Sequence, residues 1–447
     1  MCKLTFINHA SYILESNSSV LLVDPWVEGG AFDNGWSLLD SSITNQMLVD
    51  YLTGTDKAIF IWLSHEHPDH FSIPFIKKLK ENKVEAKFFF QKTLDGRIAQ
   101  FIRKFGFSIT ESNDKLEVLD QELSIITFPY SGGDSCALMM LNELSILNIN
   151  DCIVQDNIGV EHIIRHYKKY TNNIDLLLTQ FGYANWVGNP NEVEVRRKSA
   201  KEKIDRILLQ IRRFEPKAVI PFASFAYFSD KDNFHTNDSQ NTPKDVSSLF
   251  ESNRLSNELI VLKPWDTLDL NKTLKQESTI RKKNILHWET LFHAITPNYI
   301  DDKKLSIEEI KEAYKFFARK NFKHYLFAPR LFEIFKKIHP VEFYIYDLDL
   351  NVILSYREGL RIENGCKEKC DISLSAATLK FTLMHEYGVN TTHVNGKFER
   401  VSEDGVEFFS TFFTPQEYMK MGYGLTNPFA SLKLLTIALG RRLLNKK

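Results

Sequence analysis

The stretch Ser64-His65-Glu66-His67-Pro68-Asp69-His70 follows directly on the apolar run Ala58-Ile59-Phe60-Ile61-Trp62-Leu63, and this junction decides the fold. A continuous apolar run of this length predicts a buried strand, so three of the 13 histidines in the chain gather where a strand ends. Imidazole nitrogens and carboxylate oxygens are ligands for divalent cations. In an extended loop, His65 and His67 project to one side while Asp69 and His70 turn to the other. The loop is therefore predicted to hold two adjacent metal ions; the alternative is a solvated, histidine-rich loop.

The sequence around this loop alternates short β-branched runs with helical patterns. Strands are expected over 4–7, 11–14, 20–23, 58–63, 86–90, 123–128, 138–141 and 144–148, and helices over 72–81 and 93–105. A second block has helices near 160–170 and 194–214 and strands at 174–179 and 218–222. Such alternation is typical of a layered α/β structure in which helices cover sheets.

A polar stretch over 271–284 lacks apolar periodicity and is interpreted as a linker. The domain boundary is therefore placed near residue 275, with a metal-binding catalytic domain over 1–275 and an α+β domain over 276–447. The second domain is expected to contain helices over 306–320 and 330–338 and a hairpin over 341–346 and 352–356. A length of 447 residues agrees with two domains.

Composition narrows the classes of partner and compartment. Lys and Arg total 56 against 57 Asp and Glu, so the net charge of −1 disfavours nucleic acid as the main partner. Five scattered cysteines do not resemble a secreted disulfide framework, and the N-terminus shows neither a signal peptide nor a membrane span. The protein is expected to be cytoplasmic.

The histidine loop resembles the signature His-x-His-x-Asp-His of the metallo-β-lactamase superfamily, which also follows a buried strand. The runs Ser19–Asp24 and Leu144–Asp151, each ending in an aspartate, resemble two further elements of that superfamily. The resemblance implies an αββα sandwich and makes Asp151 a metal-bridging ligand beside those of the loop. Asp24 is expected to orient a ligand histidine, because such rings commonly donate their free N–H to a carboxylate.

The chain departs from that superfamily at two outer histidines. The segment Phe128–Ser135 offers Tyr130 and Asp134 but no imidazole, and Ile220–Phe228 also lacks histidine. His235 is the nearest replacement and is predicted to be the missing outer ligand. Oxygen ligands in place of imidazole shift preference from zinc toward iron or manganese. Two divalent ions are expected, with iron favoured and zinc or manganese as alternatives; loss of one ion is the other reading.

A narrower resemblance covers residues 1–270. The stretches Asp24–Trp36, Leu147–Cys152 and Pro221–Lys231 resemble the catalytic domain of the CMP-N-acetylneuraminate hydroxylases. In that family the metal domain is joined to a Rieske iron and sulfur domain, but here no Cys-x-His pairs with a Cys-x-x-His. The resemblance therefore implies a separate electron donor, a reductase or ferredoxin, for an oxygenase acting on a small or nucleotide-linked metabolite.

Three functions follow from these observations. The favoured one is a non-haem iron or di-iron oxygenase that hydroxylates a small molecule. The second is a binuclear metallohydrolase of an ester, lactone or phosphodiester, in which Asp69 positions the attacking hydroxide. The third is a binding protein whose metal site has decayed.

Further side chains are assigned roles around the predicted centre. The candidate catalytic residues are Asp69, His9 and Tyr130; His9 lies in Asn8-His9-Ala10-Ser11, which resembles a segment of the ascorbate-lactonase-like branch of the superfamily. The cations Arg196, Arg197, Lys198 and Lys201 suit a phosphate or carboxylate, or else form a solvated helix face.

The C-terminal domain weakly resembles sterol-carrier-like domains. The resemblance rests on Asp371–Met384 and on Val394–Phe398 with its Asn-Gly turn. Such domains hold apolar ligands or make dimer contacts, so a homodimer is one expectation. The aromatic residues Phe408, Phe409, Phe412 and Phe413 are interpreted as core.

Overall fold

The computed structural model describes residues 2–298, 305–420 and 423, which fall into two compact units. The first unit comprises residues 1–184, 193–229 and 237–297, and the second comprises 185–192, 230–236 and 298–447, the undescribed positions within these ranges excepted. Two short segments that precede residue 237 in the sequence therefore belong to the second unit. In the described part of the chain, no helix has the length and apolarity needed to cross a membrane.

The first unit contains two seven-stranded sheets. The strands of the first sheet are, in spatial order, β16 (Thr267–Asp269), β1 (Lys3–Asn8), β2 (Ser11–Glu15), β3 (Ser19–Val23), β5 (Ala58–Trp62), β6 (Lys87–Phe90) and β7 (Ser108–Glu111). Pairing is parallel from β3 through β7 and antiparallel elsewhere. Parallel neighbours bring their carboxyl ends to the same edge of the sheet.

The second sheet has the same mixed character. Its strands are, in order, β15 (Glu258–Leu259), β13 (Ala218–Phe222), β12 (Leu176–Gln180), β11 (Leu144–Asn150), β10 (Ser135–Leu141), β9 (Leu123–Pro129) and β8 (Leu116–Val118). Strands β11, β12, β13 and β15 pair in parallel, and the rest pair antiparallel. A small antiparallel pair joins β4 (Trp36–Leu38) to β14 (Ala226–Phe228).

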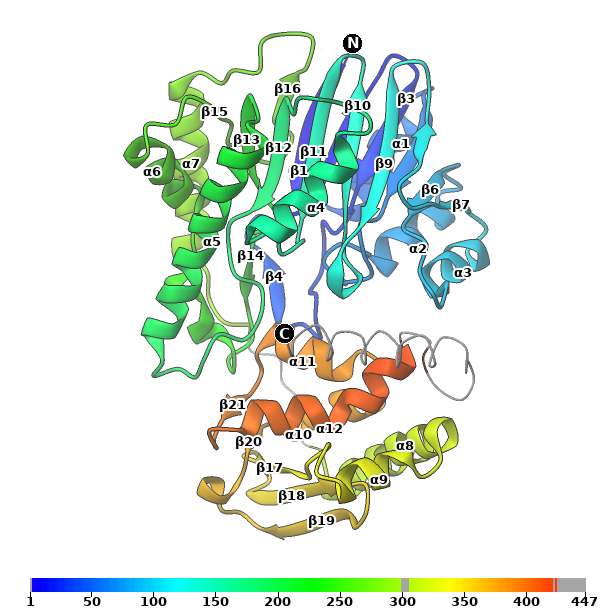
Figure 1. Cartoon of the computed structure of the whole chain (residues 1–447), viewed down its shortest axis with the longest axis vertical. Helices are drawn as coiled ribbons and strands as arrows, with labels where there is room; N and C mark the ends of the chain where they lie inside the picture. Colours follow the sequence, from blue (N-terminus) through cyan, green and yellow to red (C-terminus); the bar gives the residue numbers. More distant parts are fainter. Residues whose placement is uncertain (1, 299–304, 421–422, 424–447) are drawn as a thin grey trace, which may run out of the picture. The chain divides into compact units, whose positions relative to one another are not determined.

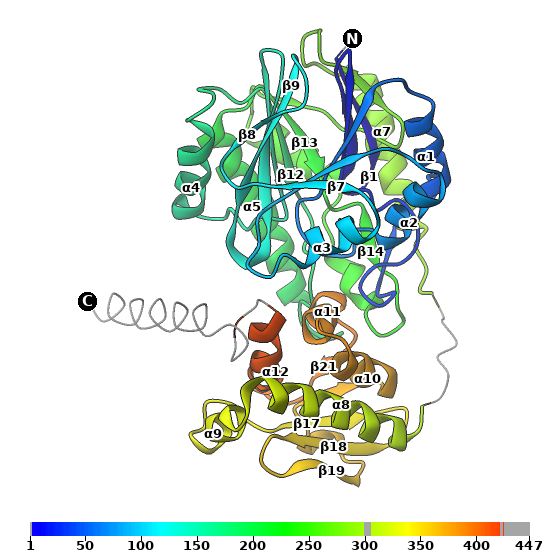
Figure 2. The same cartoon turned by 90° about the vertical axis from the view of Figure 1, so that its right-hand side faces the viewer.

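Helices cover the outer face of each sheet, as Figures 1 and 2 show. The first sheet is covered by α1 (Asn45–Thr53), α2 (Ile73–Glu81) and α3 (Arg97–Lys104). The hydrophobic core that contains the second sheet is covered by α4 (Asn157–Tyr167), α5 (Val193–Phe214), α6 (Pro243–Ser252) and α7 (Ser278–His293). Strand β3 shows the layering, because Leu21 and Val23 face the core between the sheets while Val20 and Leu22 face α1 to α3. The expected αββα sandwich is confirmed.

The boundary between the units differs from the sequence-based expectation. It falls after Pro297 and not near residue 275, because α7 begins at Ser278 and packs on the first unit. The ring of Trp288 is buried, with its centroid 4.1 Å from that of Phe225. Residues 278–284, about two turns of α7, belong to the polar stretch that is interpreted as a linker from the sequence, so the apolar face of the helix is not apparent there.

The second unit is an α+β structure with its own core. Its sheet has the order β19 (Gly359–Asn364), β18 (Leu350–Ser355), β17 (Val341–Ile345), β20 (Ile372–Leu374) and β21 (Glu399–Arg400), and its helices are α8 (Ile307–Tyr325), α9 (Ala328–Ile334), α10 (Ala376–Met384), α11 (Gly388–Asn395) and α12 (Gly405–Lys420). The antiparallel β17–β18 pair matches the predicted hairpin. Phe409, Phe412 and Phe413 are buried as expected, whereas the sterol-carrier-like identity stays a prediction.

Candidate metal centre

The histidine loop is anchored by Asp24, which lies just beyond the end of β3. Because β3 and β5 are parallel neighbours, Asp24 and the loop after β5 lie at the same edge of the sheet. The fully buried carboxylate of Asp24 accepts hydrogen bonds from the backbone N–H of Ser64 at 2.8 Å and from its hydroxyl at 2.7 Å. It also lies 2.9 Å from Nδ1 of His70 and accepts from the amide of Asn150 at 2.8 Å. Asp24 therefore orients His70, as the sequence suggested.

Ligand-type side chains form three overlapping groups at this edge. Within each group the nitrogen and oxygen atoms lie no more than 4.8 Å apart. The groups are His65, His67 and Asp134; His65, His70 and Asp151; and His9, Asp69 and His70. The groups share His65 and His70, so they form one continuous cluster that spans two adjacent cation positions.

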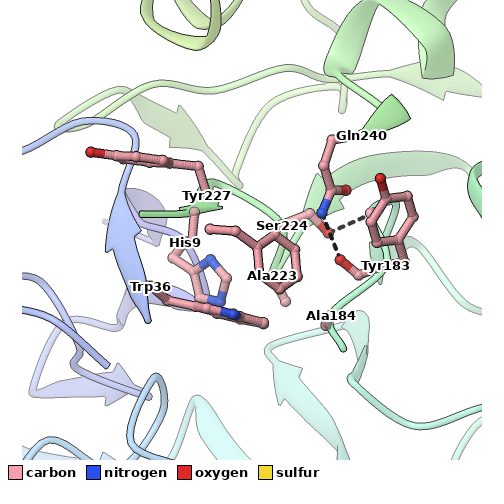
Figure 3. A pocket seen from close by; sticks show the side chains of 11 residues that line it. His9, Trp36, Tyr183, Ala184, Ala223, Ser224, Tyr227 and Gln240 are labelled. Carbon is pink, nitrogen blue, oxygen red and sulfur yellow. Dashed lines mark hydrogen bonds between the residues drawn. The ribbon is translucent and has the colours of Figure 1, made fainter. Parts of the chain in front are cut away.

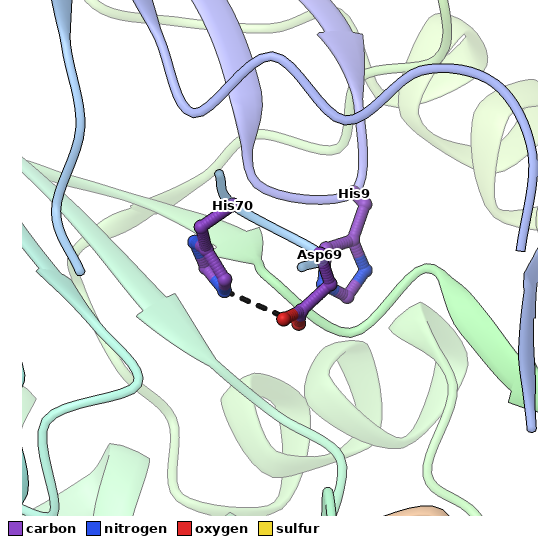
Figure 4. Close-up of side chains that lie close together, drawn as sticks. All are labelled: His9, Asp69 and His70. Atoms are coloured by element: carbon purple, nitrogen blue, oxygen red, sulfur yellow. Dashed lines mark ion pairs between the residues drawn. The ribbon is translucent and has the colours of Figure 1, made fainter. Parts of the chain in front are cut away.

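Asp151 and Asp69 occupy the middle of this cluster. Oδ2 of Asp151 lies 3.4 Å from Nε2 of His70 and 4.0 Å from Nε2 of His65. Oδ2 of Asp69 lies 3.3 Å from Nε2 of both His70 and His9. Figure 4 shows the Asp69 carboxylate between the two imidazole rings. Asp151 therefore lies next to the two histidines that the groups share, and its role as a bridging ligand, which the resemblance implied, stays a prediction.

The buried atoms at the centre fit bound cations. Oδ1 of Asp69 and Nδ1 of His9 make no hydrogen bond to any described residue, and Nε2 of His70 and of His9 have only the carboxylate contacts of 3.3 to 3.4 Å. Buried polar atoms in folded proteins nearly always have a partner, and a divalent cation would supply it. All of the ligand atoms are nitrogen or oxygen, a set that suits iron, manganese or zinc.

The electrostatics of the cluster agree with cation binding. Burial lowers the pKa of His65 well below its ordinary value, and His70 and His67 act in the same direction, so the ring is neutral and able to ligate. Burial alone would raise the pKa of Asp69, but His70 and His9 hold it well below its usual range. Burial raises the pKa of Asp134 to about 6, because the carboxylate has been removed from water.

Tyr130 and Asp134 lie in the same segment, on either side of a short glycine turn. The hydroxyl of Tyr130 donates to the carbonyl oxygen of Ile153 at 2.9 Å, and its catalytic role stays a prediction. Asp134 belongs to the group with His65 and His67; it lies directly before β10 and after Gly132 and Gly133, whose φ angles of 84° and 96° only glycine adopts readily. The sequence signal was available: an acidic residue stood where the superfamily places an imidazole.

His235 and the basic run on α5 also lie elsewhere. His235 belongs to the second unit, where its Nε2 is 3.4 Å from the carbonyl oxygen of Gly188, and the three groups of described residues do not include it. Its role as a ligand stays a prediction. Arg196 is buried against Asp238, whereas Arg197 and Lys201 form exposed pairs with neighbours on their own helix.

A small pocket adjoins the cluster through His9. Figure 3 shows His9 and Trp36 on one side of the pocket and Tyr183 and Gln240 on the other. The hydroxyl of Ser224, which also lines it, accepts from the backbone N–H of Gly182 at 2.9 Å. The indole N–H of Trp36 is buried and makes no hydrogen bond to any described residue. His9 therefore contacts the cluster on one side and a partly aromatic pocket on the other.

The chain is similar to named hydroxylases in sequence. It is 24% identical over 295 residues to the cytidine monophosphate-N-acetylneuraminic acid hydroxylase of Danio rerio, a match that covers 62% of this chain and 47% of that protein. It is 24% identical over 371 residues to the protein of Homo sapiens named as an inactive cytidine monophosphate-N-acetylneuraminic acid hydroxylase, covering 76% of this chain and 70% of that one. The chain thus spans about half the length of the Danio rerio relative.

Among solved structures, CmlA, a diiron beta-hydroxylase from Streptomyces venezuelae, superposes with a TM-score of 0.41 at 13% identity, over 60% of this chain and 54% of that one. The model of the beta-lactamase superfamily domain matches residues 3–197, which include every member of the metal cluster. This part of the chain is therefore similar to the beta-lactamase superfamily domain.

Proposed function

We propose that the protein is a non-haem di-iron oxygenase that hydroxylates a small or nucleotide-linked metabolite. The observation that carries this proposal is the ligand cluster, in which Asp134 stands where hydrolases of the superfamily place an imidazole. A carboxylate in that position makes the site harder and favours iron over zinc. The hydroxylase names of the sequence relatives support the same choice.

Each side chain of the cluster has a role in this function. His65, His67 and Asp134 would hold one ion, His70 and Asp69 the second, and Asp151 both. Bound iron would supply the redox chemistry for oxygen activation. His9 contacts Asp69 and lines the pocket of Figure 3, so it is placed to ligate the second ion, to bind substrate or to move a proton.

A binuclear metallohydrolase is the second candidate. The complete His-x-His-x-Asp-His loop and the Asp69 carboxylate between His70 and His9 support it, because two cations could acidify a water that Asp69 then positions. This candidate predicts turnover without oxygen.

Metal content and the origin of oxygen separate the two functions. Protein purified without added metal under exclusion of oxygen is expected to contain two iron ions per chain by elemental analysis. With CMP-N-acetylneuraminic acid as the first substrate tested, the product is expected to carry label from ¹⁸O₂ and none from labelled water. Zinc alone, together with anaerobic turnover and label from water, would establish the hydrolase instead.

The electron supply gives a further prediction. We propose that the electrons come from a separate reductase and ferredoxin, since the chain carries no cysteine and histidine pattern for a Rieske cluster. Iron-loaded protein with oxygen alone is expected to complete at most about one turnover, whereas adding a ferredoxin and its reductase, or dithionite, should give many. Equal turnover with and without reductant would contradict a separate donor.

A further inference from the structure

Helix α5 carries two cations on the side that packs toward the metal centre. Its buried positions include Ala200, Ile207 and Gln210, which recur at the spacing of one helix face. Lys203 lies on this same face, three residues after Ala200 and four before Ile207, and Arg206 follows one turn later. Both side chains are half-buried, although charged residues usually occupy the solvent face of a helix.

A short chain of hydrogen bonds connects Lys203 with the cluster. Nζ of Lys203 donates to Oε1 of Gln180 at 2.5 Å, and Nε2 of Gln180 donates to Oδ1 of Asp151 at 2.9 Å. Gln180 ends β12 and Asp151 follows β11, and these strands are parallel neighbours. The ammonium group is therefore one side chain away from a bridging carboxylate.

Arg206 has donors that the described residues leave unused. One Nη2 hydrogen bond reaches Oε1 of Gln155 at 3.2 Å, while Nε is buried and has no hydrogen-bond partner among the described residues. Arg206 lies close enough to Tyr130 and Asp151 for their charges to act on it. The guanidinium carries further N–H donors beyond the one that bonds Gln155, and charged donors of this kind bind oxyanions well.

Neither Lys203 nor Arg206 has a direct counter-charge among the described residues, although Asp151 acts on both from a longer distance. Other basic residues of α5 form ion pairs: Arg196 with Asp238, Arg197 with Glu194, Lys201 with Asp205 and Arg213 with Glu161. Within the described chain, neither Lys203 nor Arg206 has a carboxylate within 4.0 Å. Burial, followed by Arg206, lowers the pKa of Lys203 to about 7. Half-buried like charges without a counter-charge are costly, and a bound anion would offset that cost.

We propose that Lys203 and Arg206 form an anion-binding subsite beside Asp151, which holds a phosphate or carboxylate group of the substrate. This rests on the proposed function only in naming the ligand as substrate; anion binding itself needs neither iron nor turnover. The sequence already suggests the same helix for an anion, at Arg196, Arg197, Lys198 and Lys201. A group held there would be positioned next to the bridging carboxylate of the metal centre.

Titration calorimetry on metal-free full-length protein tests the subsite, because removing the metal with EDTA prevents phosphate from binding to it. The probes are inorganic phosphate and acetate, which distinguish the two sources of an oxyanion. Lys203→Met and Arg206→Met are each expected to weaken binding of the preferred probe about tenfold, the effect of one charge-assisted contact. Arg206→Lys should lose part of that affinity, because lysine keeps the positive charge but lacks the planar set of N–H donors of a guanidinium.

The matched control is Lys201→Met, which removes a cation from the same helix whose side chain is 76% exposed and paired with Asp205. It should bind the probes like the unchanged protein. Thermal unfolding of every variant is measured with and without phosphate at roughly 10 mM. The unfolding temperature reports folding, and its increase with phosphate reports binding. Only the control should show the same increase as the unchanged protein. Absence of binding to the unchanged protein, or equal binding by Lys203→Met, Arg206→Met and the control, would overturn the proposal. Neither result would bear on the iron content that tests the oxygenase.

Discussion

Asp134 is the side chain on which the metal preference depends at the scale of single residues. It completes a group with His65 and His67, and loss of its carboxylate should release one ion. Asp134→Ala is expected to lower the metal content from two ions per chain to one, measured by elemental analysis. Asp134→His, which restores the imidazole, should keep two ions and raise the ratio of zinc to iron.

The comparison variant is His235→Ala, because the sequence predicted His235 as the outer ligand and the described groups do not include it. Full metal content in His235→Ala and half in Asp134→Ala would assign the outer position to Asp134. The reverse pattern would assign it to His235.

Asp120 gives a residue-scale prediction of stability. Its carboxylate accepts from the backbone N–H groups of Glu122 and Leu123, each at 2.7 Å, and from the hydroxyls of Ser16 and Ser18. Burial opposes ionisation, but these hydrogen bonds prevail and lower the pKa to about 2. A carboxylate with a lowered pKa stabilises the fold above its unfolded pKa and loses that contribution as the pH falls toward 2.

Asp120→Asn is therefore expected to lower the free energy of unfolding by about 1 kcal/mol at pH 7, a modest value because the side chain is partly exposed. The difference from the unchanged protein should narrow at pH 3, as urea unfolding at both pH values would show. Asp205→Asn, which removes an exposed carboxylate from α5, should cost less than about 0.5 kcal/mol. If the free energies of unfolding of Asp120→Asn and of the unchanged protein differed by the same amount at both pH values, the role of the ionised carboxylate would be contradicted.

At the scale of the element, α5 holds its N-terminal half in place with one buried ion pair. Arg196 has no exposed side-chain surface and forms two hydrogen bonds with Asp238, at 2.8 and 2.7 Å. Arg196→Met is expected to lower the free energy of unfolding by about 2 kcal/mol, less than for a wholly buried pair because Asp238 is 37% exposed. Arg197→Met, which breaks an exposed pair, should change it by less than about 0.5 kcal/mol. Chemical denaturation of both variants makes the comparison, and equal losses would contradict it.

At the scale of the whole molecule, two separate cores predict two unfolding transitions. The second unit contains a buried pair in which Nζ of Lys397 lies 3.1 Å from Oδ2 of Asp230, with both side chains at most 8% exposed. Lys397→Met leaves the Asp230 carboxylate without its cation, so the free energy of unfolding of the second unit should fall by about 3 kcal/mol. Lys397→Met combined with Asp230→Asn should recover part of the loss.

The metal content of Lys397→Met should stay at the level of the unchanged protein, because the cluster lies in the first unit. Lys367→Met, which breaks an exposed pair with Glu399, is the control and should leave both transitions in place. A single transition that shifts as a whole, with loss of metal, would show that the two units do not unfold separately.

The sequence by itself determined the layered fold and the inner ligands of the site. Alternating apolar runs require strands that bury two faces, and the order His-x-His-x-Asp-His after a strand is local, so neighbouring residues suffice to place those ligands on one edge. Asp151 followed from the resemblance to the superfamily, and it too comes directly after a buried strand. These features depend on short-range geometry that the chain carries in its order.

Only the tertiary structure decided which side chains complete the site. Asp134 and His9 come from segments far apart in the chain, and their approach to the histidine loop depends on sheet order and on a glycine turn. No local pattern reports these quantities, so the sequence offered both Tyr130 and Asp134 in that segment and named His235 as the outer ligand. The second unit likewise takes residues 185–192 and 230–236 from inside the first domain of the sequence, because packing contacts, unlike chain order, define a compact unit.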